Sequence, residues 1–232
     1  MAPDTRNLMP QAAWLTIRTL CRLGLRRITV RASGMEHIPQ HGPVILAARH
    51  YHYTWDGIAI FARVNRQLRA VAAVDWLPPG RLRGALLAAC AAAGWPAIMR
   101  DPLRGEYDRA TERERRGLLL QATRDAIEVL REGRPLLIFP EGYPVIDPHP
   151  TPTRAEGELL PFQPGVLRIA LLAARQLGQP IPIVPIGLRY TPGRRWTLDL
   201  RVGEPLLIGP QANLAEAGAA LEAEVRRLSG IA

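Results

Sequence analysis

The sequence contains no lysine. All 30 of its basic residues are arginine, and they outnumber the 21 acidic residues to give a formal net charge of +9. A GC-rich genome can account for the choice of arginine over lysine, but it does not account for the net charge. Arginine binds phosphate groups through a planar, bidentate pair of hydrogen bonds. The basic excess therefore predicts an anionic partner: a phospholipid surface, a phosphorylated substrate or nucleic acid.

Cysteine is also scarce. The two cysteines, Cys21 and Cys90, lie in apolar, helix-like stretches, where cysteine usually serves as a small core residue. Two cysteines do not make a disulfide scaffold, and no C-x-x-C pair is present to supply half of a zinc site. The sequence therefore has to build its stability from an apolar core.

Long hydrophobic runs are absent as well. The longest uncharged run near the middle, residues 84–99, has 16 residues and contains Gly94 and Pro96. A membrane-spanning helix needs about 20 apolar residues. Charged residues interrupt the N-terminal stretch, which is unlike a signal peptide. We expect a cytoplasmic protein that is bound peripherally to the inner face of the cell membrane.

What is present is a regular alternation of strands and helices. The predicted strands cover residues 28–32, 43–48, 70–74, 96–100, 135–139, 181–189 and 196–202. The predicted helices between and after them cover residues 57–68, 81–93, 108–131, 166–176 and 214–228. This order predicts a single α/β domain, with a central mixed, largely buried sheet flanked by helices. Residues 144–164 have no periodicity and predict a lid or binding loop.

The chain divides by pattern into an N-terminal amphipathic segment, residues 1–27, and an α/β domain, residues 28–232. Arg18, Arg22 and Arg26 recur every four residues of a predicted helix and form a basic stripe. Two interpretations remain open. The helix could lie in a membrane interface, or it could pack on its own domain with a solvated arginine edge.

Polar residues follow the apolar strand at 43–48. His50 and His52 come directly after it, and Asp56 stands where the next helix begins. A histidine held by a carboxylate is the minimum general-base unit. Asp56 could instead be only a helix cap. The same three residues could form part of a metal site, but the remaining histidines lie in turn-like or proline-rich segments, so we expect no metal.

Two further strands end in residues suited to binding. Glu141 and Gly142 follow the strand at 135–139, and Arg100 ends the strand at 96–100. Glu141 could accept a hydrogen bond from a substrate hydroxyl, or be an exposed turn acid. Arg100 could hold a phosphate, or be one surface arginine among many. Together with residues 184–187, which suggest a structural or pocket-lining role, these segments are expected at the ends of strands of one sheet.

The order and spacing of these segments resemble the glycerophospholipid acyltransferase family of the PlsC type. The pair Arg49-His50 followed by Asp56 resembles the family's His-x4-Asp motif, and residues 94–100 are similar to its second motif. Residues 139–142, Phe-Pro-Glu-Gly, match the start of the third motif, usually Phe-Pro-Glu-Gly-Thr-Arg-Ser. Residues 162–165 and 184–186 resemble the later steps, so the resemblance runs from about residue 30 to residue 189.

The resemblance implies a fold, a reaction and roles for individual residues. His50 would remove the proton from an acceptor hydroxyl, and Asp56 would orient His50. The donor would be a thioester of acyl-CoA or acyl-carrier protein, and the acceptor a lysophospholipid, either 1-acylglycerol-3-phosphate or a related lipid, met at an anionic membrane surface. Arg100, Glu141 and Gly142 would hold the glycerol phosphate. Neither a metal nor a bound cofactor is implied.

Three departures from the family pattern affect these roles. Five residues separate His50 from Asp56 instead of four. With His52 as the base, only three residues would intervene. We prefer His50, because the pair Arg49-His50 stands where the family has Asn-His, and keep His52 as the alternative base or as a contact for the acceptor. Tyr143 begins the Tyr-Pro-Val that replaces Thr-Arg-Ser, so it could favour another head group, with Arg154 supplying the missing cation. Arg49 replaces an asparagine; we expect it to contact the substrate, and it would lower the pKa of the base if it lay close to it.

Two other classes of function compete with the enzyme. A lipid-binding protein of the same fold without turnover would fit the altered spacing of His50 and Asp56. A nucleic-acid binder would fit the charge, but no helix-turn-helix, zinc finger or RNP-like motif is present, and we expect no nucleic-acid partner.

Overall fold

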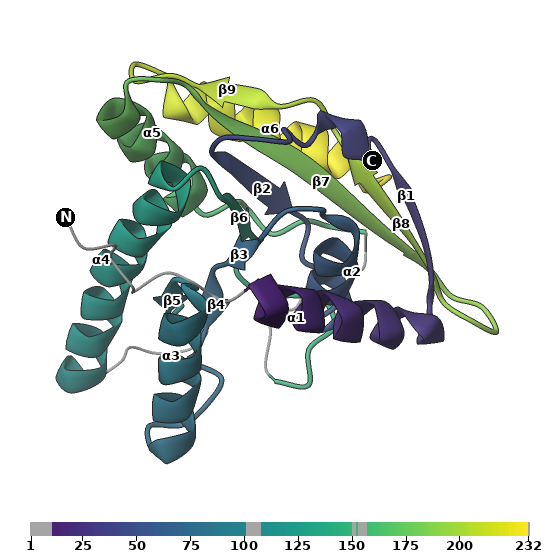
Figure 1. Ribbon diagram of the computed structural model, residues 1–232, viewed down its shortest axis with the longest axis horizontal. Coiled ribbons are helices and arrows are strands. Elements are labelled where there is room, and N and C mark those ends of the chain that lie inside the picture. The colour runs from purple at the N-terminus through teal and green to yellow at the C-terminus, as the bar shows by residue number, and fades with distance from the viewer. Residues whose placement is uncertain (1–10, 101–107, 150–151, 153–156, 232) are drawn as a thin grey trace.

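The centre of the molecule is a mixed sheet in the order β1-β8-β7-β2-β6-β3, with β9 paired to β7 (Figure 1). Its strands are β1 (Thr29–Ser33), β2 (Val44–Ala48), β3 (Arg69–Ala70), β6 (Pro135–Ile138), β7 (Ile181–Thr191), β8 (Thr197–Val202) and β9 (Leu206–Ile208). In the middle of the sheet, β2 runs parallel to both β6 and β7. Antiparallel pairing enters through β8 and β9, which both pair with β7. The structure is a computed structural model, and it describes residues 11–100, 108–149, 152 and 157–231.

Helices cover both faces of the sheet. One face is covered by α1 (Gln11–Gly24) and α2 (Trp55–Arg63). The other is covered by α4 (Arg109–Arg131), α5 (Gly165–Leu177) and α6 (Leu214–Leu228), while α3 (Arg81–Ala93) projects beside α4 (Figure 1). The predicted single α/β domain with a central mixed sheet is confirmed.

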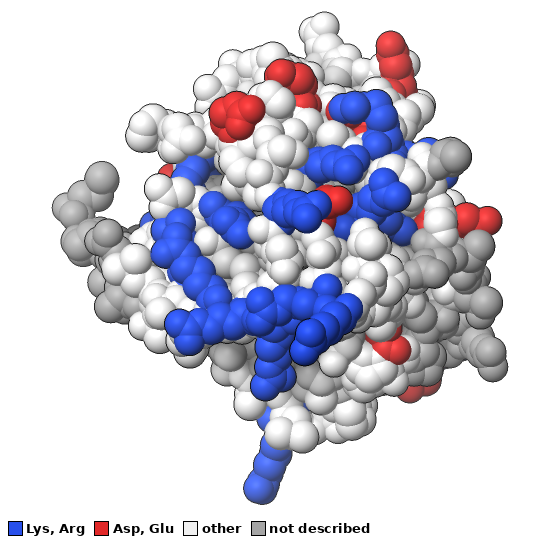
Figure 2. Space-filling model, turned by 90° about the vertical axis from the view of Figure 1, so that its right-hand side faces the viewer, with Lys and Arg blue, Asp and Glu red and all other residues white. Residues whose placement is uncertain are grey.

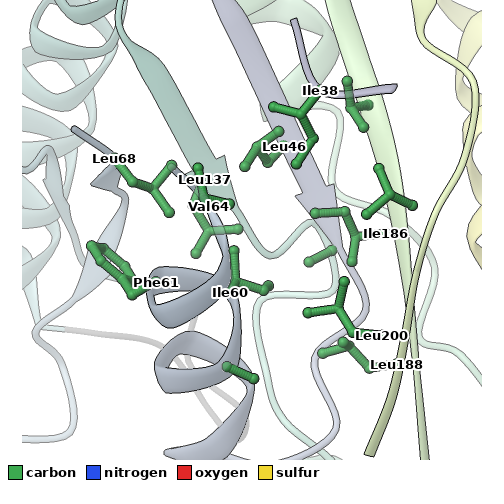
Figure 3. Packing of buried hydrophobic residues seen from close by; sticks show 14 of the residues in the cluster. Ile38, Leu46, Ile60, Phe61, Val64, Leu68, Leu137, Ile186, Leu188 and Leu200 are labelled. Carbon is green, nitrogen blue, oxygen red and sulfur yellow. The ribbon is translucent and has the colours of Figure 1, made fainter. Parts of the chain in front are cut away.

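The strand β2 shows why the sheet is buried on both faces. Val44, Leu46 and Ala48 belong to the core beneath α1 and α2, whereas Ile45 and Ala47 belong to the core on the opposite face. All five are fully buried, as expected for a continuous apolar run in the parallel part of a sheet. Figure 3 shows Leu46 on the first face, packed with neighbouring strands and with α2. Because the end of β2 is held in the core, the position of the polar residues that follow Ala48 is fixed.

Two predicted elements differ from the structure, and one strand was not predicted. The helix predicted at 57–68 ends at Arg63, because Val64 turns to an extended conformation and both Val64 and Leu68 are buried in the core. The strand predicted at 70–74 is split into β3 and β4 (Ala72–Ala73). β9 was not predicted because three residues are too few to show a period.

The split strand overturns one expectation about the site. β4 pairs with β5 (Ala97–Ile98) in a separate two-stranded sheet. Arg100 therefore follows a strand of this small sheet, and the expectation that all the candidate segments end strands of one sheet is wrong for Arg100. Because β4 follows β3 after one residue, the small sheet still continues from the edge of the large one.

The N-terminal helix shows features of both interpretations left open by its sequence. Trp14 is buried against Phe61 of α2, with ring centroids 5.9 Å apart. Arg18 donates a 2.6 Å hydrogen bond to Asn65, so part of the arginine stripe faces the domain. The outer surface of α1 instead exposes three leucines, Leu15, Leu20 and Leu23. No helix in the described part of the chain is long and apolar enough to cross a membrane.

Candidate active site

Asp56 and His50 meet where β2 ends and α2 begins. Nδ1 of His50 lies 3.0 Å from Oδ2 of Asp56. Asp56 stands in the first turn of α2, and its side chain is fully buried. Because the carboxylate accepts the proton on Nδ1, the other ring nitrogen, Nε2, keeps its lone pair, and His50 lines a cleft. The pair has the arrangement of a general base and its orienting acid.

The turn between His50 and Asp56 accommodates the fifth intervening residue. Besides His50, Oδ2 of Asp56 accepts hydrogen bonds from the backbone N–H groups of Tyr51 at 2.6 Å and His52 at 2.8 Å. The backbone from His50 to His52 therefore wraps around the carboxylate. With five intervening residues the histidine and the carboxylate are still in contact.

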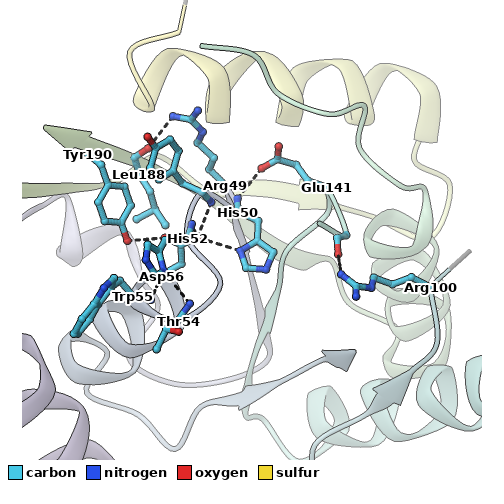
Figure 4. A network of polar contacts seen from close by, with 12 residues as sticks. Arg49, His50, His52, Thr54, Trp55, Asp56, Arg100, Glu141, Leu188 and Tyr190 are labelled. Atoms are coloured by element: carbon cyan, nitrogen blue, oxygen red, sulfur yellow. Dashed lines mark hydrogen bonds and ion pairs between the residues drawn. The ribbon is translucent and has the colours of Figure 1, made fainter. Parts of the chain in front are cut away.

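Tyr190, a residue that the sequence did not single out, holds the other oxygen of Asp56. Its hydroxyl donates a 2.7 Å hydrogen bond to Oδ1 (Figure 4). Burial, and secondarily the charge of Asp56, raise the pKa of Tyr190, so the phenol stays protonated and acts as a donor. Tyr190 lies on β7, downstream of the segment that resembles the fourth motif. It is 134 positions away from Asp56 in the chain, so there was no local signal by which to find it.

His52 plays a different part from His50. Its Nδ1 accepts hydrogen bonds from the N–H groups of Thr54 at 3.1 Å and Trp55 at 3.4 Å, at the start of α2. Burial lowers the pKa of His52, which favours the neutral ring that this acceptor role requires. His52 meets Asp56 through its backbone N–H only. The ring therefore serves as a cap for the helix start.

The third motif supports His50 from the other side. The ring of Phe139 stacks on His50 with centroids 4.1 Å apart. Glu141 is 1% exposed; its Oε1 accepts a 2.6 Å hydrogen bond from the N–H of His50, and its Oε2 accepts one from Leu160 at 3.1 Å. The expectation that Glu141 contacts a substrate hydroxyl needs correction, because its carboxylate is buried and bonded to the backbone. Glu141 instead ties the base to the segment around Leu160.

Arg100 lies on the far side of the cleft with an acidic partner. Its Nε and NH2 atoms both lie 2.9 Å from Oδ2 of Asp75, and its NH1 donates a 3.1 Å hydrogen bond to the carbonyl of Gly142. The guanidinium also stacks over the ring of Tyr143 at 4.0 Å. Gly142 has a φ of 76°, a conformation that favours glycine. Arg100, Gly142 and Tyr143 thus form one unit around Asp75, which the sequence did not single out.

Arg49 does not face the cleft. It is buried, its NH1 donates a 3.1 Å hydrogen bond to the carbonyl of Leu188, and its guanidinium lies over the ring of Tyr51. The expectation that Arg49 contacts substrate is therefore corrected: the side chain points into the β7 side of the fold (Figure 4). It links the start of the His50 turn to the strand that carries Tyr190.

A cleft of about 380 Å³ is lined by His50, Phe139, Arg100 and Gly142. Part of the predicted loop at 144–164 lines it, through Pro144, Asp147, Pro148 and His149. This part of the loop is fixed by pairing with the His50 turn, since Tyr53 donates to the carbonyl of Ile146 at 3.0 Å. Arg154 lies outside the described residues. Where the chain is described, no three His, Cys, Asp or Glu side chains are grouped as a metal site.

Comparisons with known proteins find a family model and a solved structure that match the chain. The sequence model of the family described as Acyltransferase matches residues 29–189. Among solved structures, the chain is similar to the crystal structure of the 1-acyl-sn-glycerophosphate (LPA) acyltransferase, PlsC, from Thermotoga maritima. The TM-score is 0.62 and the sequence identity 21%, over 95% of this chain and 79% of that chain. Comparison with curated proteins gives no match. At 21% identity, the structural likeness shows a shared fold.

Proposed function

The chain belongs to the acyltransferase family, and on that premise we propose that it is an O-acyltransferase acting on a lysophospholipid or a related amphiphile. The acyl donor is a thioester of coenzyme A or acyl-carrier protein. The observation that carries the proposal is the 3.0 Å contact between His50 and Asp56 beside the cleft. A histidine with one nitrogen bonded to a carboxylate and the other toward a cleft is equipped to activate a hydroxyl.

The proposed reaction transfers the acyl group directly to the acceptor. Nε2 of His50 takes the proton of the acceptor hydroxyl as the oxygen attacks the thioester carbonyl. The carbon–sulfur bond then breaks, and the leaving thiolate takes the proton back from the imidazolium. Asp56 stabilises the imidazolium between these two proton transfers. The products are an ester and a free thiol, and no acyl group is held on the protein.

Three residues hold His50 in position. Asp56 fixes the tautomer, Phe139 fixes the plane of the ring, and Glu141 holds the backbone N–H. We assign them positioning roles. Arg100 and Gly142 line the cleft, and Tyr143 covers the guanidinium of Arg100.

The alternative of a lipid-binding protein without turnover was suggested by the altered spacing of His50 and Asp56. The contact between the two side chains argues against it, because the extra residue is taken up in the turn. Catalysis is therefore the better explanation of the site.

The proposal places the protein at an anionic membrane surface, where its lipid substrates reside. Figure 2 shows arginines gathered on the side that carries β1, the end of α1 and the β7–β8 connection, with few acidic residues among them. The exposed arginines on these elements and at the end of α2 are Arg22, Arg26, Arg27, Arg31, Arg63, Arg194 and Arg195. The exposed leucines of α1 border this surface and would add apolar burial to charge attraction.

Formation of product tests the reaction. The full chain is incubated with palmitoyl-CoA and a lysophospholipid, and the lipids and the protein are analysed by mass spectrometry. The proposal predicts a diacyl lipid that requires both substrates, with the mass of the chain unchanged. Thiol release that does not depend on the acceptor, or a stable acyl-protein, would contradict it.

Sedimentation with vesicles tests the membrane surface. Binding is expected to increase when anionic lipid is added, and to weaken in Leu20→Ser and Leu23→Ser. Leu120→Ser is the matched control, because Leu120 is an equally exposed leucine on α4. Binding that is equally weak with and without anionic lipid would contradict the proposed attachment to an anionic membrane.

A further inference from the structure

The charges around the cleft are unusual for a site that would take a phosphate. Among the described residues that line it, the only arginine is Arg100, and the only carboxylate is Asp147. Asp75 lies directly behind Arg100, so the positive charge of one guanidinium is outnumbered by the negative charges of two carboxylates, those of Asp75 and Asp147. The remaining lining is largely apolar or aromatic.

Arg100 is already engaged by the protein. Nε and NH2 are bonded to Asp75, and NH1 is bonded to the carbonyl of Gly142. The side chains of Arg100 and Asp75 are only 12% and 10% exposed, so the pair is largely shielded from water. Tyr143 covers one face of the guanidinium. Each of the three guanidinium nitrogens therefore has an acceptor in the protein.

A phosphate monoester would be poorly received here. It carries about 1.5 to 2 negative charges at neutral pH. On approaching Arg100 it would meet the Asp75 carboxylate as well, and Asp147 lines the same cleft. To bind Arg100 bidentately it would have to displace Asp75, which would leave a shielded carboxylate without its cation.

Other residues that line the same cleft fit a cation. The rings of Trp76 and Tyr53 line it and are 44% and 53% exposed. The ring of His149 lies against Trp76 with centroids 5.6 Å apart, and Oδ1 of Asp147 accepts a 2.9 Å hydrogen bond from the backbone N–H of His149. Aromatic faces next to a carboxylate are the surroundings that an ammonium group prefers.

We propose that this cleft selects an acceptor whose head group carries an ammonium group, and that it discriminates against a phosphate monoester. The selecting residues are Asp75, which neutralises Arg100, and Asp147 with Trp76, which attract the cation. This inference rests on the proposed acyl transfer and narrows its acceptor.

The test compares three acceptors that share one acyl chain. Palmitoyl-lysophosphatidylethanolamine carries an ammonium group, palmitoyl-lysophosphatidate carries a phosphate monoester, and monopalmitoylglycerol is neutral. Each is presented in the same mixed micelles with palmitoyl-CoA, and kcat/KM is measured from thiol release. We expect the ammonium-bearing acceptor to exceed both others by at least about tenfold, a difference of roughly 1.4 kcal/mol. Equal or better use of lysophosphatidate or monopalmitoylglycerol would overturn the inference and leave acyl transfer standing. Absence of transfer to all three would remove the proposed function itself, and the inference with it.

Two variants test which residues determine the choice of acceptor. Asp75→Asn leaves the charge of Arg100 uncompensated. The kcat/KM for lysophosphatidate, relative to that for lysophosphatidylethanolamine, should therefore rise by at least about tenfold. Asp147→Asn should lower the advantage of the ammonium-bearing acceptor over monopalmitoylglycerol by about tenfold. Asp125→Asn, on α4 and outside the cleft, is the matched control and should leave both ratios unchanged. If Asp75→Asn does not fold, the comparison of acceptors and Asp147→Asn still decide. Unchanged ratios in a folded Asp75→Asn or Asp147→Asn variant would overturn the role given to that residue.

Discussion

The hydroxyl of Tyr190 lies 2.7 Å from Oδ1 of Asp56 and donates to it from the end of β7. The opposite oxygen of Asp56 accepts from the ring of His50 and from two backbone N–H groups. The acid behind the proposed base is thus held from both sides, by a turn next to it in sequence and by a strand far from it. This arrangement fixes the direction of the carboxylate more tightly than the turn alone could.

Replacing Tyr190 by phenylalanine should affect catalysis through Asp56. Without the phenol, negative charge concentrates on the carboxylate, which favours the imidazolium form of His50. We expect kcat to fall about tenfold, equivalent to roughly 1.4 kcal/mol, with KM little changed. The acidic limb of the kcat/KM profile should move to higher pH. A variant with lower activity but an unshifted profile would reduce Tyr190 to a packing role.

Glu141→Gln should damage both stability and turnover. One of the two N–H groups that the carboxylate now satisfies would face the amide NH2 of glutamine, at a cost of about 1–3 kcal/mol for a buried unsatisfied donor. Since one of these N–H groups belongs to His50, kcat should fall about a hundredfold, roughly 2.7 kcal/mol. Urea unfolding and thiol release measure the two effects.

Glu222→Gln is the control for that experiment. Glu222 likewise accepts a hydrogen bond from a backbone N–H, that of Phe162, but it does not line the cleft. It should lose stability while kcat stays at the wild-type value. Full activity in Glu141→Gln would show that the tie to His50 does not matter for the reaction.

His52 should make the stability of the protein depend on pH. Burial holds its folded-state pKa below the ordinary value, so the unfolded chain takes up the proton first as the pH falls. The contribution of His52 is therefore complete above about pH 6.5 and is lost as the pH falls from there toward the lowered folded-state pKa.

The difference between wild type and His52→Asn isolates this effect. Asparagine can still accept at the start of α2 but does not titrate in this range. We expect the free energy of unfolding of the wild type to fall relative to that of the variant between pH 6.5 and 5. Parallel curves for wild type and His52→Asn would mean that His52 is not held neutral.

The sequence predicts the parts of this site that are local. The apolar run at 43–48, the histidine after it and the acid at the next helix start are close in the chain, and the predicted alternation places them at a strand end. The sequence could not predict that Arg100 pairs with Asp75, because the strand between them belongs to a separate small sheet. Nor could it predict that Glu141 is buried, since the same Phe-Pro-Glu-Gly turn would suit an exposed acid.

The proposed acyl transfer depends most on His50, the base that activates the acceptor. The direct measurement is acceptor-dependent thiol release from palmitoyl-CoA for wild type, His50→Ala and His52→Asn, with the three acceptors described above. The account predicts that His50→Ala lowers kcat about a thousandfold, within the range for loss of a general base. His52→Asn should retain most of the activity, because its cap on α2 is preserved. Wild-type turnover in His50→Ala, or its loss only in a folded His52→Asn, would contradict the account.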